Sequence, residues 1–133
     1  MNYGQTYTNI FKLILSTIKT KDCSNFSELL SEISNDETII ELRNELNDDN
    51  KSISYIQDIL NEQLKLNLVV GTSQDNKDGK FFTIERLSPN GYIYLDEVSK
   101  PNFWEKFKNH AKENGLALTA ENITKFIANS LWD

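Results

Sequence analysis

Residues 52–67, SISYIQDILNEQLKLN, run directly into the apolar stretch LVV at 68–70, which is followed by GTSQDNKDGK at 71–80 and FFTIERL at 81–87. At 100° per residue, the first stretch predicts a helix whose core-facing side holds Ile53, Ile56, Leu60, Leu64 and Asn67, with Ile59 at its margin. The apolar stretches predict strands over 68–72 and 80–87. Asp78–Gly79 is a favoured pair for the tight turn between them.

The order helix, strand, turn, strand is that of the second half of a winged helix, whose recognition helix enters the DNA major groove. The outward face of this helix would carry two acids, Asp58 and Glu62, which repel phosphate. Polar and basic side chains on the same face can bond base edges or phosphates, and lysines of the wing can meet the backbone. The predicted DNA-contacting residues are Lys51, Ser54, Tyr55, Asn61, Lys65, Lys77 and Lys80.

Three helices are predicted ahead of this segment, over 8–20, 25–33 and 37–46. Thr8 or Asn9 is the expected cap of the first helix, and Ser24 of the second. The run NDDNKS at 47–52 predicts a polar turn before the recognition helix.

Three more helices are predicted after the hairpin. Ser88–Pro89 begins a helix that extends to Val98, with Ser as its cap and Pro at its first position. Residues 101–114 form a helix that ends at Gly115, and residues 120–132 form one capped by Thr119. We expect the last two to be an antiparallel helical hairpin.

The expected fold class is therefore α+β and mostly helical: a winged helix-turn-helix with a two-stranded wing and a C-terminal helical hairpin. A length of 133 residues favours a single domain, 1–133. Within it, residues 8–98 would form the winged-helix core and residues 99–133 the helical hairpin.

The stretch from Arg86 to Trp132 resembles the C-terminal half of an uncharacterised winged-helix family of Gram-positive bacteria and their prophages. The matching positions are Leu87, Ser88, Gly91, Tyr92, Tyr94, Leu95 and Asp96, then Trp104 with Lys106 and Lys108, then Gly115, Leu116 and Leu118. With the preceding helix and the LNLVV junction, where Asn67 replaces a usual glycine, the resemblance covers roughly residues 51–132. It implies the winged-helix fold, and it transfers no activity and no functional residues.

The charge is uneven, with a net value of −6. Residues 22–65 carry eleven acids against Arg43, Lys51 and Lys65, which opposes nonspecific binding to DNA. A DNA-associated regulator is the leading interpretation. The alternative is a winged helix that does not bind DNA: an acidic protein-interaction module or phage inhibitor that occupies the basic channel of a host nucleic-acid enzyme. Its contact residues would be Glu41, Glu45, Asp48 and Asp49.

No pattern of residues indicates catalysis. The one histidine, His110, has Glu113 three residues on, and two ligands are fewer than zinc requires. Cys23 has no histidine near it in sequence, and there is no phosphate-binding glycine loop. We expect no enzyme activity, no cofactor and no metal.

Five large aromatic residues, Phe103, Trp104, Phe107, Phe126 and Trp132, lie in the last two predicted helices. At helical spacing such residues more often form core. The functional alternative is the seam of a homodimer, which would set two recognition helices about one DNA turn apart.

The sequence also bears on location. No apolar run approaches the ~18 residues of a membrane-spanning helix. A single cysteine excludes a disulfide within the chain, and no secretory signal is recognised. We expect a cytoplasmic protein with no membrane partner; its abundant Asn, Ile and Lys fit AT-rich codons, as in low-GC bacteria and their phages.

Overall fold

The computed structural model describes the backbone of residues 3–132 and the side chains of residues 5–119 and 121–130. Over this range the fold is α+β and mostly helical, with one two-stranded antiparallel sheet. The elements are α1 (Tyr3–Thr20), α2 (Phe26–Ile33), α3 (Glu37–Leu46), α4 (Asp49–Lys65), β1 (Val69–Asn76), β2 (Gly79–Leu87), α5 (Pro89–Val98), α6 (Phe103–Glu113) and α7 (Ala120–Trp132).

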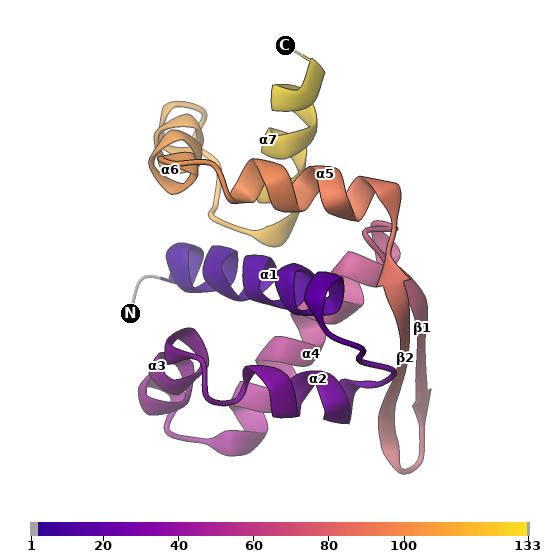
Figure 1. The fold of residues 1–133 in the computed structure, drawn as a ribbon. Helices are drawn as coiled ribbons and strands as arrows, with labels where there is room; N and C mark the ends of the chain where they lie inside the picture. Colours follow the sequence, from indigo (N-terminus) through magenta and orange to yellow (C-terminus); the bar gives the residue numbers. More distant parts are fainter. Residues whose placement is uncertain (1–2, 133) are drawn as a thin grey trace.

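Helix α1 crosses the middle of the molecule, with α5 on one side and α2 and α3 on the other (Figure 1). Ile10, Phe11, Ile14 and Leu15 have no exposed surface, because neighbours cover two faces of the helix. A single hydrophobic core extends from these residues to Ile127 of α7. Helices α2, α3, α4, α5 and α7 are therefore arranged around α1, and α6 packs on α5 and α7.

Helix α1 is longer than predicted, since it begins at Tyr3 and the expected caps, Thr8 and Asn9, lie inside it. Its first turns carry mostly polar residues and so lack the apolar stripe that marks a helix in sequence. The cap of α2 is Asn25, whose side chain accepts a hydrogen bond from the Glu28 backbone N–H at 2.9 Å. Ser24, the predicted cap, instead accepts a bond from the Ile84 N–H of β2 at 2.9 Å through its carbonyl.

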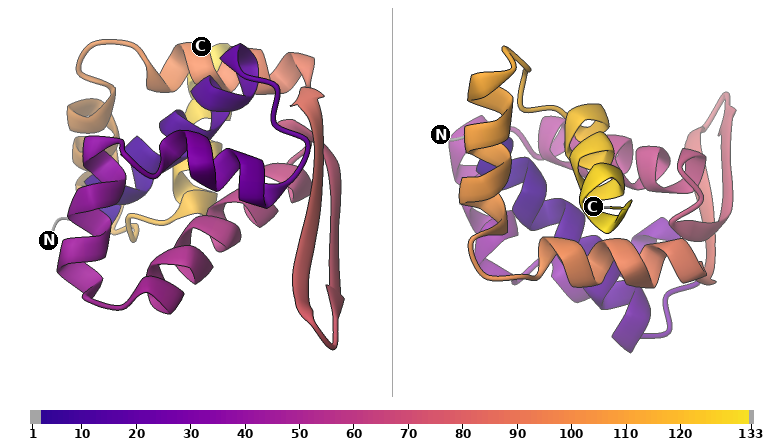
Figure 2. Two further views of the ribbon diagram at one scale, coloured as in Figure 1. Left: turned by 60° about the horizontal axis from the view of Figure 1, so that its bottom comes forward. Right: turned by 90° about the horizontal axis from the view of Figure 1, so that it is seen from above.

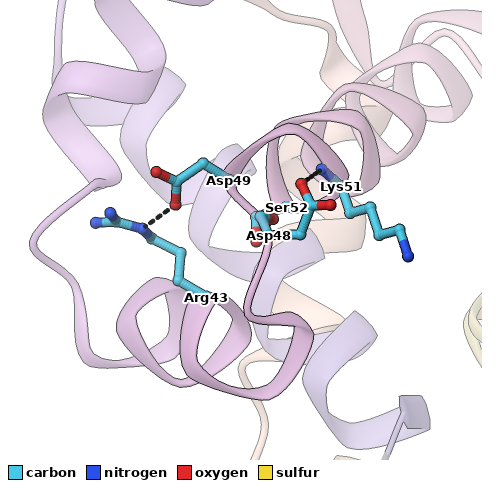
Figure 3. Close-up of polar contacts among 5 residues, drawn as sticks. All are labelled: Arg43, Asp48, Asp49, Lys51 and Ser52. Carbon is cyan, nitrogen blue, oxygen red and sulfur yellow. Dashed lines mark hydrogen bonds and ion pairs between the residues drawn. The ribbon is translucent and has the colours of Figure 1, made fainter.

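The predicted turn at 47–52 is mostly helix, because α4 begins at Asp49. The connection between α3 and α4 is only Asn47, in the left-handed conformation, and Asp48. Asp48 caps α4 by accepting a bond from the Lys51 N–H at 3.1 Å (Figure 3). A polar run with Asp at its start is thus a helix N-terminus.

The hairpin is longer than predicted, since β1 and β2 pair along most of the stretch expected to be a polar tip, which leaves only Lys77 and Asp78 as the turn. The ladder shifts register between Val70 and Gly71, which is typical of a β-bulge. Asn25 forms a bridge with Thr83, so the segment between α1 and α2 lies along β2. The exposed ribbon is held by backbone pairing, which leaves no apolar pattern in the sequence.

Helix α5 begins as predicted, with the Ser88 hydroxyl accepting a bond from the Gly91 N–H at 3.0 Å. The same hydroxyl donates to the Asn67 carbonyl, which fixes the end of the α4–β1 junction to α5. Gly91 faces the Leu68 carbonyl closely: a Cβ placed there would lie 2.1 Å from that oxygen. Ser88 and Gly91 therefore both serve this one junction.

Helix α6 begins at Phe103, two residues later than predicted, after Asn102 in the left-handed conformation. The predicted cap of α7 is confirmed, since the Thr119 hydroxyl accepts from the Asn122 N–H at 3.3 Å. In Figure 1, α6 is seen nearly end-on while α7 runs up the page, and the view from above in Figure 2 agrees. The two helices therefore cross, and the expected antiparallel arrangement is wrong.

The aromatic rings of α6 and α7 pack on one another within the chain. Phe103 and Phe107 are buried, with ring centroids 5.7 and 5.6 Å from that of Phe126. Trp104 is half-buried against Phe107 at 6.2 Å. The side chain of Trp132 lies outside the described residues. Phe103 and Phe107 are therefore used inside the chain, and a homodimer remains a prediction.

Gly91→Ala is expected to lower the free energy of unfolding by about 1–3 kcal/mol, because the new methyl group must displace the Leu68 carbonyl. Asn90→Ala, one residue earlier and exposed, should change it by less than about 0.5 kcal/mol. Urea unfolding followed by circular dichroism measures both. Equal midpoints for the two variants would contradict the close contact between α5 and Leu68.

Candidate functional site

Helices α3 and α4 and the hairpin form the part of the molecule in which the sequence predicts DNA contacts. Arg43 near the end of α3 holds the first turn of α4 through an ion pair, Nε to Asp49 Oδ1, at 3.2 Å (Figure 3). Ser52 is buried beneath it and donates to the Asp48 carbonyl at 3.0 Å. The two-residue connection and the Arg43–Asp49 pair thus join the end of α3 to the first turn of α4.

The buried side of α4 differs from the predicted one. It consists of Ser52, Ile56, Ile59, Leu60 and Gln63. Asn67 is exposed and lies beyond the helix, while Ile53 and Leu64 are only half-buried. Gln63 is fully buried, and its Nε2 donates to the Phe11 carbonyl of α1 at 3.0 Å, which offsets the cost of burying the amide. A prediction based on apolar side chains could not assign two polar residues to the core.

The predicted DNA-contacting residues differ in how far they are exposed. Lys51, Ser54 and Lys65 are exposed on α4, and Lys77 and Lys80 are exposed on the hairpin. The other two are half-buried. Tyr55 packs against the ring of Tyr7 at 6.4 Å, and Asn61 lies towards the edge of the exposed face.

Two of the exposed lysines are engaged with the acids of the same surface. Lys80 of β2 lies 3.6 Å from Asp58 of α4, and Lys65 lies 3.8 Å from Glu62. Such exposed pairs contribute only about 0–1 kcal/mol each. Lys51 and Lys77 form no ion pair with any residue the structure describes. Of the four exposed lysines predicted to contact DNA, two are thus paired with acids and two have no ion pair with a described residue.

The four acids of the alternative hypothesis are divided between two places. Glu41 and Glu45 follow Glu37 at four-residue spacing on α3, and the three line a hollow of about 870 Å³. The opposite wall of this hollow belongs to α1: Gln5, Thr6 and Asn9. Asp48 and Asp49 lie outside it, since one caps α4 and the other pairs with Arg43.

The residues considered for catalysis lie apart from both surfaces. His110 of α6 has its ring 5.0 Å from that of Phe126. Cys23 is buried and lines a second hollow, about 570 Å³, at the end of α1. Lys19, Lys21, Arg86 and Tyr92 also line it, and sequence reasoning missed them. The one available signal was the N-terminal segment, in which residues 1–21 carry three lysines and no acid.

Burial raises the pKa of the Cys23 thiol, and the nearby carboxylates of Glu32, Glu28 and Asp22 add to the effect, while Lys21 opposes it. Burial likewise raises the pKa of the Tyr7 hydroxyl, with Glu62 the next cause. Both groups are therefore neutral at physiological pH. Neither is activated as a nucleophile, because a reactive thiol requires a lowered pKa.

Comparison with protein-family models, with curated proteins and with solved structures found no match for this chain. Within the described range, no cluster of three or more His, Cys, Asp or Glu side chains is suited to hold a metal ion. None of the helices described is both long and apolar enough to cross a lipid bilayer. The function of this chain is therefore inferred from how its side chains are arranged.

Alkylation of Cys23 by iodoacetamide is expected to be slower in the folded protein than in the guanidinium-unfolded protein at pH 7.5. Burial both restricts access and, by raising the pKa, reduces the thiolate fraction. The pH at which the folded protein reaches half its maximal rate should lie above that of the unfolded chain. Mass spectrometry of the intact protein counts the single adduct. Equal rates in both states would contradict a buried thiol.

Proposed function

We propose that this chain is a small, cytoplasmic, non-enzymatic winged-helix protein that associates with double-stranded DNA as a regulator through α4 and the hairpin. The order α3, short connection, α4, β1, β2 supports the winged-helix interpretation. The bridge between Asn25 and Thr83 adds support, because it joins the segment after the first helix to the wing strand.

The observation that carries the proposal is the contact between Lys80 and Asp58. It brings the hairpin to the exposed side of α4, so that the two elements form one surface. Free cations lie on both of its parts, Lys51 on the first turn of α4 and Lys77 at the hairpin turn. A duplex that received α4 in its major groove would have the hairpin beside it.

The acids of this surface favour sequence-specific over nonspecific binding to DNA. Asp58 and Glu62 each occupy a lysine that would otherwise neutralise a phosphate. Nonspecific affinity depends on the number of neutralised phosphates, so it is expected to be weak at physiological salt. Recognition would then depend on base contacts from side chains such as Ser54, and specific sites would be favoured over bulk DNA.

The double variant Lys51→Ala/Lys77→Ala is expected to bind labelled duplex DNA more weakly, with a log-log salt slope smaller by about 1.8, near 0.9 for each lost phosphate contact. Fluorescence anisotropy at a series of salt concentrations measures both quantities. Mixed-sequence duplex and a duplex from upstream of the protein's own gene are compared.

Lys106→Ala/Lys112→Ala removes the same charge from exposed, unpaired positions of α6 and is the matched control. Asp58→Asn should change affinity in the opposite direction, because it releases Lys80 and removes a negative charge. If the two double variants bind alike, or if none of the proteins binds duplex at low salt, then α4 and the hairpin are not a DNA surface.

A second candidate function, binding of a basic protein segment, is favoured by the hollow between α1 and α3. Glu37, Glu41 and Glu45 line it in a row, and amide and hydroxyl groups face them from α1. A lysine- or arginine-rich segment complements this arrangement in charge, and opposite fields raise the encounter rate. Its volume of about 870 Å³ is within the size range of ligand-binding pockets.

Changing Glu37, Glu41 and Glu45 together to Gln is expected to weaken binding of a fluorescent lysine-rich peptide at least tenfold. Changing Asp75, Asp96 and Glu113 to Asn, Asn and Gln removes the same charge at exposed positions elsewhere, and should leave affinity within about twofold. Anisotropy titration compares the two variants. Equal loss in both would show that the peptide responds only to net charge.

A further inference from the structure

The hollow at the C-terminal end of α1 is formed by three parts of the chain that are distant in sequence. The end of α1, the connection from Lys21 to Ser24 and the Ile84–Leu87 segment of β2 line it, and Tyr92 of α5 closes one side. These elements converge at the right of Figure 1, on the side of β2 that meets the α1–α2 connection. With about 570 Å³, the hollow is within the size range of small-molecule sites.

Each of these three parts contributes one cation: Lys19 from α1, Lys21 from the connection and Arg86 from β2. All three side chains are exposed, and none is in an ion pair with a residue that the structure describes. In a chain of net charge −6, these three cations leave the lining of the hollow with a small excess of positive charge, +1 once its two acids are counted.

The two acids that line the hollow are Asp22 and Glu85. Neither lies within 4 Å of the three cations as an ion pair among the described side chains. The cations are therefore not committed to internal partners. Three buried apolar residues, Ile18, Ile84 and Leu87, also line the hollow.

Tyr92 gives the hollow an aromatic side. It is 45% exposed, although it is large and partly apolar. The Lys19 ammonium lies 5.8 Å from its ring centroid, so the ring and a cation are presented together. A guanidinium, two ammonium groups and an aromatic ring suit a phosphate with an attached planar base.

We propose that this hollow binds a nucleotide, with Lys19, Lys21 and Arg86 holding the phosphate and Tyr92 contacting the base or sugar. The nucleotide is either free or a residue of a single strand; the chemistry at the hollow is the same. The inference goes beyond the DNA surface proposed for α4 and the hairpin, because the four residues named here belong to neither α4 nor the tip of the hairpin.

The test is a titration of the ¹⁵N-labelled full chain with adenosine monophosphate, with inorganic phosphate and with an oligothymidine eight-mer, followed by amide chemical shifts. Saturable shifts confined to residues 18–24, 84–87 and 92 are expected with the mononucleotide or with the eight-mer. Saturation by the mononucleotide identifies a free nucleotide, and saturation by the eight-mer alone identifies a strand. Neither result depends on duplex binding by α4.

Lys21→Ala/Arg86→Ala is expected to weaken this binding at least tenfold, while Lys106→Ala/Lys112→Ala, with the same change in charge, leaves it within twofold. All four side chains are exposed, so both variants should retain the wild-type pattern of amide shifts elsewhere. Tyr92→Ala should weaken nucleotide binding without changing the response to inorganic phosphate. Absence of saturable shifts at the hollow, or equal weakening in both double variants, would overturn the proposal.

Discussion

The burial of α1 is the constraint on which the rest of this structure depends. An 18-residue helix with Ile10, Phe11, Ile14 and Leu15 fully enclosed must be covered along two faces. Each such side chain contributes about 1.5–3 kcal/mol when it leaves water, so no arrangement that exposes α1 can compete. Helices α2, α3, α4, α5 and α7 all contact it.

The position of α4 follows from this constraint. Gln63 is buried against α1, and its bond to the Phe11 carbonyl requires one rotation of α4 about its axis. That rotation turns Tyr55 partly inward and leaves Lys51, Ser54 and Asp58 outward. The identity of the residues offered to a partner is thus determined by a polar contact in the core. Gln63 Oε1 has no partner in the described residues, so the arrangement also leaves one buried acceptor unsatisfied.

Much of the fold could be predicted from the sequence, since the first four helices were recognisable by apolar periodicity and α5 and α7 by the capping chemistry of Ser88 and Thr119. The predictions were wrong where polar residues cap helices or lie in the core: Asp48 caps α4, Asn25 caps α2, and Gln63 is buried. The outer hairpin is paired by backbone groups, which no side-chain pattern reveals. The crossing of α6 and α7 depends on how their rings pack, and helical spacing does not specify it.

The candidate sites could be predicted less well, because they depend on pairs of residues distant in sequence. The exposed lysines of α4 and the hairpin were identifiable, but the engagement of Lys80 by Asp58 was not. The acids at 41–49 looked like one patch, and the cap and the ion pair divide it. Lys21 and Arg86 come together only because the α1–α2 connection lies along β2.

The hairpin contacts the helical part of the chain through two interactions of different kinds, one near its base and one near its tip. Near its base, the bond from the Ile84 N–H to the Ser24 carbonyl is a backbone contact that dissolved ions affect little. Towards its tip, the contact is the exposed ion pair of Lys80 and Asp58. Dissolved ions weaken such pairs, with a Debye length of about 8–10 Å at physiological salt. A higher ionic strength therefore weakens the contact near the tip and hardly affects the contact at the base. Added salt is therefore expected to loosen the tip of the hairpin from α4, while its base stays attached to the α1–α2 connection.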